Sequence, residues 1–309
     1  MRIAAIDLGT NTFNLLVADA DAKNFREIYR DKKAVKLGQH GITQHKIPDD
    51  AIVRGISAIK EYIKIITPPG IDKILAVATS AVRSTENGVA FTKTLNNEFG
   101  LDIRIIDGDK EAELIYYGIR KAVPLNSENV LILDIGGGSN EFIIGNVSRI
   151  SWKKSFPLGT ARLLELFNLS NPLTYLEIEN VLNYFEKEIK PLTEAINIYP
   201  IKTLVGSSGS FDTLANIYNI EKNKLPVSAE TTFLKFHKPE LLKLCSKIIH
   251  STVEERNVMQ GMDLMRIEML PLAALFIQFI INKTNVTEII QSAYSIKEGI
   301  IFSYSETEN

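Results

Sequence analysis

The stretch ILDIGGGSNEFIIG at residues 132–145 repeats, in outline, the stretch AIDLGTNTFNLLVA at residues 5–18. In each copy an apolar strand reaches an aspartate, Asp134 or Asp7, and the chain passes through a loop of small residues into a second apolar strand. A turn of this kind aims several backbone N–H groups at one point, where an anion can bind. Two copies in one chain therefore predict two similar domains that face a shared phosphate.

The two loops supply the candidate phosphate-binding residues. The first copy contributes Gly9, Thr10, Asn11 and Thr12, and the second contributes Gly136, Gly137, Gly138 and Ser139. Either loop could instead be a tight hairpin whose glycines only satisfy the turn geometry. The aspartates Asp7 and Asp134 are candidate ligands of Mg²⁺, directly or through water, although either could simply hydrogen-bond to its own turn.

Composition limits the possible classes of protein. The chain has 309 residues, of which 45% are hydrophobic and 23% charged, enough for two domains with substantial cores. The net charge of −2 gives no electrostatic case for binding nucleic acid or a membrane surface. Cys245 is the single cysteine, so no disulfide framework exists, and we expect a cytoplasmic location. The apolar run 269–281 contains a proline and is too short to span a bilayer, so we expect a buried helix there.

Strands and helices alternate along the chain, which predicts an α/β fold. In the first half we expect strands at 2–7, 13–18, 73–79 and 103–106, and helices at 48–66, 88–99 and 110–123. In the second half we expect strands at 130–135, 141–147, 149–156, 201–205 and 288–292, and helices at 175–197, 211–218 and 296–305. The polar segment 125–129 follows a proline, so the expected domains are 1–124 and 125–309, with the last helix packing back on the first domain.

A further loop of small residues, GSSGS at 206–210, separates an expected strand from an expected helix. Backbone N–H groups at a helix N-terminus can bind an anion. Gly206, Ser207, Ser208 and Gly209 are therefore candidate phosphate ligands, and an ordinary strand-to-helix turn is the alternative.

Several motifs together resemble the exopolyphosphatase and guanosine pentaphosphate phosphohydrolase (Ppx/GppA) family, across nearly the whole chain. They are DLGTNT (7–12), ATSAVR (78–83), KEAELIYYG (110–118), DIGGGS (134–139), LGTARL (158–163), GSSGS (206–210) and SIKEG (295–299). Each motif alone is weak, but their order and spacing are specific. The resemblance implies the actin–hexokinase–Hsp70 superfold, in which two ribonuclease-H-like domains enclose an active-site cleft.

The resemblance also implies roles for individual residues. Glu111 corresponds to the family's water-activating glutamate, although its place in the first turn of a helix would favour a glutamate in any protein. The family has Glu-Glu-Ala where this chain has Lys110-Glu111-Ala112, so we expect Lys110 to lower the pKa of Glu111 or to contact phosphate. The resemblance implies that Arg83 contacts phosphate, with Ser80 assisting; a surface salt bridge is the alternative for Arg83. It also implies that Glu141 binds the metal beside Asp7 and Asp134; a solvent-facing side chain is the alternative for Glu141.

The implied activity is Mg²⁺-dependent hydrolysis that releases terminal phosphate from inorganic polyphosphate, from guanosine pentaphosphate (pppGpp) or from both. Mn²⁺ is the alternative metal, and no organic cofactor is expected. The missing extra C-terminal domain and the near-neutral charge favour a short substrate. A small-molecule kinase of the same superfold and a non-catalytic, nucleotide-gated assembly protein are the alternatives.

We expect a homodimer, from the apolar second half, and no role for His40 and His45, which lack zinc spacing. The basic segment 30–33 is either solvated charge or a guide for a polyanion.

Overall fold

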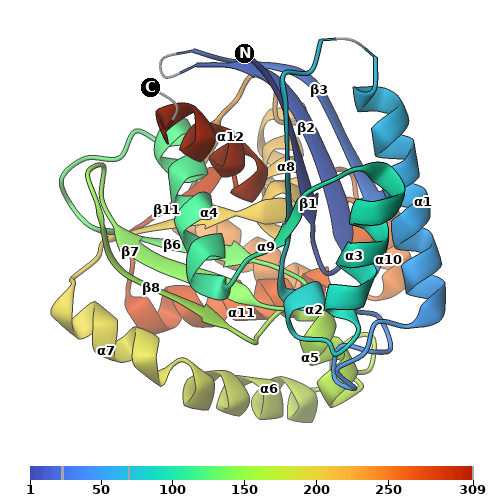
Figure 1. Ribbon diagram of the computed structural model, residues 1–309. Coiled ribbons are helices and arrows are strands. Elements are labelled where there is room, and N and C mark those ends of the chain that lie inside the picture. The colour runs from blue at the N-terminus through green and yellow to red at the C-terminus, as the bar shows by residue number, and fades with distance from the viewer. Residues whose placement is uncertain (22–23, 69, 308–309) are drawn as a thin grey trace.

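The computed structural model describes residues 1–21, 24–68 and 70–307, and contains two β-sheets separated and covered by helices (Figure 1). The first sheet has the strand order β3 (Phe25–Ala34), β2 (Thr12–Ala20), β1 (Arg2–Leu8), β4 (Lys73–Ala78) and β5 (Ile103–Ile105). The second has the order β10 (Phe233–Phe236), β11 (Glu288–Ser292), β9 (Thr203–Ser207), β6 (Val130–Ile135), β7 (Asn140–Gly145) and β8 (Ile150–Phe156).

The two sheets follow the same plan. In each, three consecutive strands form an antiparallel meander, β1–β3 or β6–β8, and the next strand along the chain pairs parallel to the first strand of that meander. Asp7 in β1 lies opposite Asn14 in β2, and Asp134 in β6 lies opposite Glu141 in β7. The internal repeat therefore corresponds to a repeated strand arrangement, and the predicted α/β class with two related halves is confirmed.

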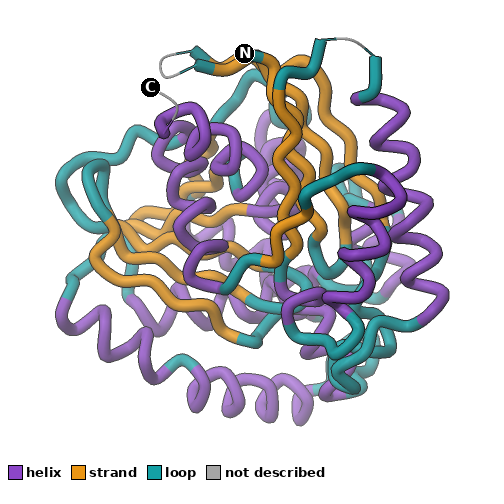
Figure 2. Tube along the Cα trace, in the orientation of Figure 1, coloured by secondary structure: helices purple, strands orange, loops and turns teal. Residues whose placement is uncertain are grey.

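Helices form three layers around the sheets (Figure 2). Helices α1 (Asp49–Ile66) and α3 (Gly88–Phe99) cover the outer face of the first sheet, where α2 (Ser80–Arg83) follows β4. The outer face of the second sheet is covered by α5 (Thr160–Phe167), α6 (Tyr175–Glu188), α7 (Lys190–Ile198), α8 (Ser208–Asn223), α9 (Lys238–Ile249) and α11 (Leu270–Thr284). The short α10 (Val253–Asn257) and a 3₁₀ turn (Leu264–Arg266) connect α9 to α11.

The middle layer consists of α4 (Gly108–Ala122) and α12 (Ile296–Thr307), and it joins the two sheets. Helix α4 follows the first sheet in sequence but packs on β7 and β8 of the second. Helix α12 follows the second sheet but packs on β1 and β2 of the first. The two helices cross in close contact, because Gly118 approaches the backbone of Ser295 and Gly299 approaches the backbone of Leu114. One apolar cluster therefore runs from the first sheet through both helices to the second.

Several elements differ from the sequence-based expectations. Strands β3 and β10 and helices α2 and α5 were not predicted; β3 carries mostly charged residues because it is an edge strand with solvated side chains. The helix expected at 175–197 is two helices that meet at Ile189, two residues before Pro191. The expected loop at 206–210 is wrong, since β9 continues to Ser207 and α8 begins at Ser208.

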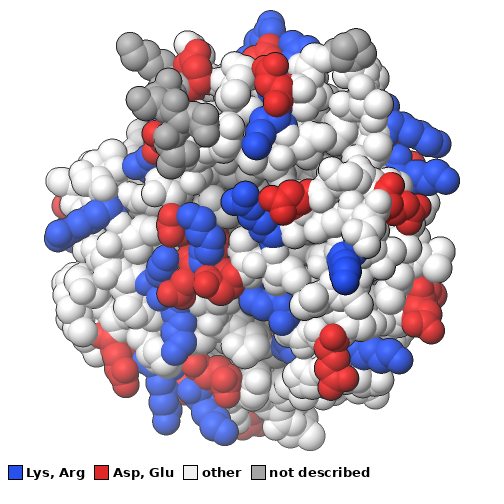
Figure 3. Space-filling view, in the orientation of Figure 1, with Lys and Arg blue, Asp and Glu red and all other residues white. Residues whose placement is uncertain are grey.

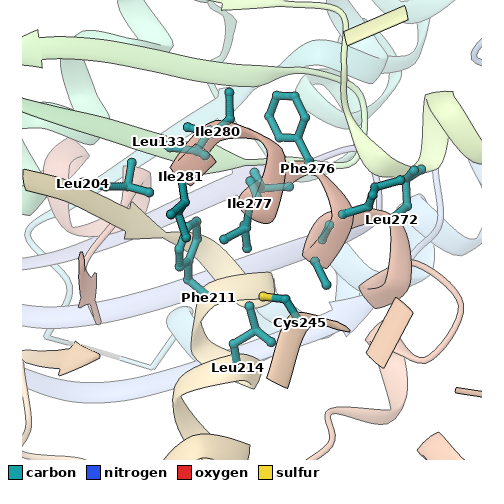
Figure 4. Close-up of a cluster of buried hydrophobic side chains, with 14 of the residues drawn as sticks. Leu133, Leu204, Phe211, Leu214, Cys245, Leu272, Phe276, Ile277, Ile280 and Ile281 are labelled. Carbon is teal, nitrogen blue, oxygen red and sulfur yellow. The ribbon is translucent and has the colours of Figure 1, made fainter. Parts of the chain in front are cut away.

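The apolar run 269–281 forms most of a buried helix, as predicted. Helix α11 is buried almost throughout and forms part of the core between the second sheet and α9 (Figure 4). The homodimer, expected from the apolar second half, stays a prediction. No helix among the described residues combines the length and the apolar character needed to cross a membrane.

Cys245 lies within the same core, against apolar side chains of α8 and α11 (Figure 4). Burial raises the pKa of its thiol to about 12. Because the thiolate is the reactive form, we expect Ellman's reagent to leave native protein unmodified over minutes at pH 8 and to label one thiol per chain in denaturant. Rapid labelling of the native protein would contradict this packing.

Candidate active site

A cleft of about 410 Å³ lies between the two sheets, and both copies of the repeat contribute to its wall. Most of the candidates selected from the sequence line it: Asp7, Gly9, Thr10, Asn11, Thr12, Ser80, Glu111, Asp134, Gly136, Gly137, Gly138, Ser139, Ser208 and Gly209. Arg83, Glu141, Gly206 and Ser207 do not. The structure thus brings the two loops and the N-terminal end of α4 to one place.

The two loops have the same turn and touch each other across the cleft. The Gly9 N–H donates to the Thr12 carbonyl and the Gly136 N–H to the Ser139 carbonyl, both at 3.1 Å. A Cβ at Gly138 would lie 2.6 Å from the hydroxyl oxygens of Thr10 and Ser80. The loops are tight turns, but none of their glycines has a positive φ, so the expectation that the glycines only satisfy the turn geometry is wrong. The absence of a side chain at Gly138 instead lets the second loop pack directly against Thr10 and Ser80.

Asp7 and Asp134 occupy equivalent positions but have different partners. Asn14 donates to Oδ2 of Asp7 at 2.9 Å, whereas Oδ1 of Asp7 has no hydrogen-bond partner although the side chain is only 5% exposed. Both oxygens of Asp134 accept hydrogen bonds from Ser207 and Ser208, at 2.6–2.8 Å. Burial raises the pKa of Asp7 to about 6 and also raises the pKa of Asp134.

Glu111 lies in the first turn of α4, which begins where the Asp107 carboxylate caps the helix by accepting from the Lys110 N–H at 2.7 Å. Its side chain is buried, and Nη1 of Arg83 donates to its Oε2 at 2.9 Å and to the Ile106 carbonyl at 2.8 Å. Burial and the charge of Glu141 raise the pKa of Glu111 well above its ordinary value, and Arg83 opposes that shift. Arg83 therefore holds Glu111, rather than lining the phosphate cleft as the resemblance implies.

Lys110 does not act on Glu111. Its Nζ lies 2.8 Å from Glu113, and the side chain is half-exposed. Lys153 approaches the same glutamate at 3.6 Å. On the face viewed in Figure 3, positive and negative side chains are interspersed in this way. The expected influence of Lys110 on the pKa of Glu111 or on phosphate is wrong, because the side chain points to the surface.

Glu141 is buried behind the second loop instead of facing solvent. Ser139 and Ser155 each donate a hydroxyl hydrogen bond to its Oε1 at 2.7 Å, and the side chain is 1% exposed. Burial, with the neighbouring charge of Asp134, raises its pKa. Glu141 thus holds the Ser139 end of the loop in place, next to Asp134 and Glu111.

Gly206 and Ser207 lie outside the cleft, so the expectation that they bind phosphate is not supported by their positions. Gly206 is packed against the ring of Phe211, which fills the space that a Cβ would need. The hydroxyl of Ser207 is used by Asp134. Only the second half of this segment, Ser208 and Gly209 at the start of α8, reaches the cleft.

The cleft lining also includes charged residues outside the predicted site: Arg30 and Lys32 of β3, Asp212 of α8, Arg266, and Lys297 at the start of α12. The motif SIKEG was a signal for Lys297, but it carried no indication of where the side chain points. Arg30 and Lys32 belong to the basic segment 30–33, for which the sequence left solvated charge and guidance of a polyanion open, and their position at the cleft is compatible with the second.

A second pocket of about 450 Å³ adjoins the first and shares Thr10 and Asn11 with it. Its lining mixes apolar side chains of α5, the segment 168–173 and the start of α11 with polar and charged ones, His40 among them. His45 instead lies by the Ser84 carbonyl, 3.1 Å from its Nδ1. Across the described ranges, no three His, Cys, Asp or Glu side chains form a group that could hold a metal ion by themselves.

The raised pKa of Asp7 has a consequence for stability. The pKa of the Asp7 carboxyl is about 6 in the folded protein, against roughly 3.9 in the unfolded chain. Its contribution to the free energy of unfolding is therefore largest below pH 4, and on the order of 3 kcal/mol of it is lost as the pH rises through 6. In EDTA we therefore expect Asp7→Asn to stabilise the protein, by a margin that grows from pH 4 to pH 7 and then levels off.

Calorimetric unfolding of parent and variant across this pH range measures the difference. Asp19→Asn is a suitable comparison, because Asp19 is an exposed partner of Arg2 and Arg26 whose pKa is lowered by them. Its substitution should destabilise the protein by a margin that stays nearly constant over this pH range, because a carboxyl with a lowered pKa loses its contribution only below about pH 4. A margin for Asp7→Asn that does not change with pH would rule out a buried, uncharged Asp7.

The fold and the site define an actin-like protein of two related halves, with carboxylates and small-residue loops converging on one interdomain cleft. The model of the Ppx/GppA phosphatase family matches residues 16–308, and the chain belongs to that family. It is a hydrolase of phosphoric anhydrides.

Individual relatives agree with this assignment. The solved structure of an exopolyphosphatase from Cytophaga hutchinsonii superposes with a TM-score of 0.95 at 36% identity, covering 99% of this chain and 98% of that one. Exopolyphosphatase 2 of Mycobacterium tuberculosis is 25% identical over 98% of both chains. A bifunctional 3-dehydroquinate synthase/phosphatase of Fusobacterium nucleatum is 34% identical over 69% of this chain, which spans only 34% of that longer protein.

Proposed function

We propose that the protein releases terminal phosphate from inorganic polyphosphate in a Mg²⁺-dependent reaction, with Glu111 as the base that orients and deprotonates water. The observation that carries the proposal is the position of Glu111. Its carboxylate is buried at the cleft that both loops line, and it is held at one oxygen by Arg83. No side chain of the described residues donates a hydrogen bond to its other oxygen, Oε1, which is suited to a water molecule.

The donor set of the cleft fits a divalent cation that completes its coordination with phosphate and water. Asp7 offers an unpartnered buried oxygen, and Asp134 lies close enough for its charge to raise the pKa of Asp7. Hard oxygen ligands of this kind suit Mg²⁺, which commonly keeps water and binds through one or two carboxylates plus substrate phosphates. When bound, the metal would supply positive charge to the phosphate oxygens.

The chain's own residues supply the rest. The turns at Gly9 and Gly136 present backbone N–H groups and hydroxyls to the phosphate, and this charge stabilisation matters more than covalent chemistry in phosphoryl transfer. Glu141 contributes through Ser139, whose hydroxyl donates to its Oε1. It is not proposed as a metal ligand because its side chain does not line the cleft. Arg83 contributes by keeping Glu111 aimed at the cleft.

Guanosine pentaphosphate is a second candidate substrate, and the second pocket favours it. That pocket shares Thr10 and Asn11 with the first, and the apolar side chains in its mixed lining suit a planar base more than a chain of phosphates. The exopolyphosphatase names of two relatives support inorganic polyphosphate as the first candidate.

The test is phosphate release from tripolyphosphate, from long-chain polyphosphate and from pppGpp, each with Mg²⁺ or with EDTA. We expect turnover of at least one inorganic substrate that requires the metal. Phosphorylation of an acid or a sugar by ATP without release of free phosphate, or nucleotide binding without any turnover, would refute the proposal.

A further inference from the structure

The charge balance of the cleft raises a question about its anionic substrate. Five carboxylates and four basic side chains line it; the acids are Asp7, Asp31, Glu111, Asp134 and Asp212, and the bases are Arg30, Lys32, Arg266 and Lys297. A polyanion entering such a site meets net repulsion unless some cation can turn to it. A cation that contacts the substrate in this way has to lie beside Asp7 and Asp134, in the same part of the cleft.

Two of the four basic side chains are held by acidic partners. Arg30 bridges Glu27 and Glu298, at 2.6 and 3.1 Å. Lys32 pairs with Asp263 at 2.6 Å. The Arg266 guanidinium packs against Gly209, with its Nε and Cζ atoms 2.7 Å from the place where a Cβ would be, and its charge lowers the pKa values of Asp134 and Asp212. These residues shape the rim and one wall of the cleft.

Lys297 is placed differently. Its side chain is 13% exposed. It lines the cleft together with Asp7, Asp134 and Asp212, and its positive charge lowers the pKa values of these three carboxyls. Its Nζ pairs with Oε1 of Glu298 at 3.2 Å. An ammonium has three donors, and this pairing leaves donors that can reach the cleft.

Glu298 does not depend on Lys297 for compensation. It is fully buried, but Arg30 also pairs with it, and the Ser295 N–H donates to its Oε2 at 2.8 Å. Lys297 can therefore turn toward a ligand without leaving a buried charge alone. The crossing of α4 and α12 at Gly118 and Gly299 fixes the distance between Lys297 and Glu111, because it joins the two helices directly.

We infer that Lys297 is a phosphate-binding catalytic residue, whose ammonium contacts the oxygens of the terminal phosphate between Asp7 and Asp134. The inference rests on the proposed function, since it concerns the same site and the same substrate. A lysine acts on phosphate as a mobile point charge, which suits a group whose charge shifts during transfer. Its removal should weaken binding of the product phosphate as well as turnover.

The experiment compares Lys297→Met, Lys297→Arg and the double variant Lys297→Met/Glu298→Gln with the parent. Lys121→Met is the matched control, since Lys121 lies in the last turn of α4, outside the cleft, and pairs with Glu306 at 3.2 Å. The readouts are kcat and KM for tripolyphosphate with Mg²⁺, the dissociation constant of inorganic phosphate by titration calorimetry, and the melting temperature.

For Lys297→Met we expect a loss of about 100-fold in kcat/KM and about tenfold weaker phosphate binding. Lys297→Arg should keep more of both, because it keeps the charge. The double variant should show the same losses of activity and phosphate affinity as Lys297→Met. Parent-like kinetics and phosphate binding in the double variant would overturn the inference, because Lys297 would then serve only to compensate Glu298. If the parent hydrolyses none of the substrates, the proposed function fails, while the phosphate titration still decides the role of Lys297.

Discussion

Glu111→Gln is expected to reduce kcat for phosphate release by about 10²–10⁴-fold, the usual contribution of a positioned general base. The amide occupies the same volume and can still accept from Arg83 through its oxygen, so the fold and the cleft should survive. What the variant loses is a group that can take a proton from water. Because burial raises the pKa of Glu111, the parent's rate should also rise with pH as that carboxyl ionises, and the variant's residual rate should lack this rise.

The matched control is Glu113→Gln, two residues further along the same helix. Glu113 pairs with Lys110 and Lys153 at the surface and does not line the cleft. We expect its kcat to stay within about twofold of the parent, since surface ion pairs contribute little. Steady-state phosphate release under saturating substrate measures both variants, and equal losses in the two would remove Glu111 from the mechanism.

Gly299→Ala is expected to destabilise the protein by about 3 kcal/mol or more, because the added methyl group overpacks a backbone contact. A Cβ there would lie 2.6 Å from the carbonyl carbon of Leu114 and still closer to its oxygen. Neither helix can yield independently, since α12 is also packed on β1 and β2 and α4 on β7 and β8. At roughly 2–4 °C per kcal/mol, the melting temperature should fall by about 6–12 °C.

Gly55→Ala provides the comparison for a glycine within a helix. There the Cβ would meet the far end of the Phe91 ring at 2.7 Å, and a side chain can shift where a backbone carbonyl cannot. The gain in helix propensity, about 1 kcal/mol, also offsets the crowding. Thermal unfolding of both variants should show a large loss only for Gly299→Ala; similar melting temperatures would mean that the helix crossing is more adaptable than its geometry indicates.

The sequence predicted those parts of the site that depend on local pattern. The repeat located Asp7, Asp134 and both loops, because an apolar strand followed by small residues has few other structures open to it. One wrong expectation was avoidable: neighbouring positions on a helix point about 100° apart, so Lys110 and Glu111 could not both face the cleft.

Other parts depended on contacts between distant segments. Strand β3 has a charged sequence, and only its pairing with β2 makes it a strand that brings Arg30 and Lys32 to the cleft. The alternation of β7 allowed Glu141 to face either side, and the hydroxyls of Ser139 and Ser155 decide that it is buried. Gly206 looked like a loop residue because nothing local shows that the ring of Phe211 folds over it.

The exchange of α4 and α12 between the sheets also constrains the order in which the molecule is made. The inner face of β1 and β2 comes from residues 2–20, yet its cover comes from residues 296–307. During synthesis, some 275 residues emerge between the strands and the helix that shields them. The apolar inner surface of β1 and β2 is therefore exposed to chaperones and proteases until α12 has been synthesised.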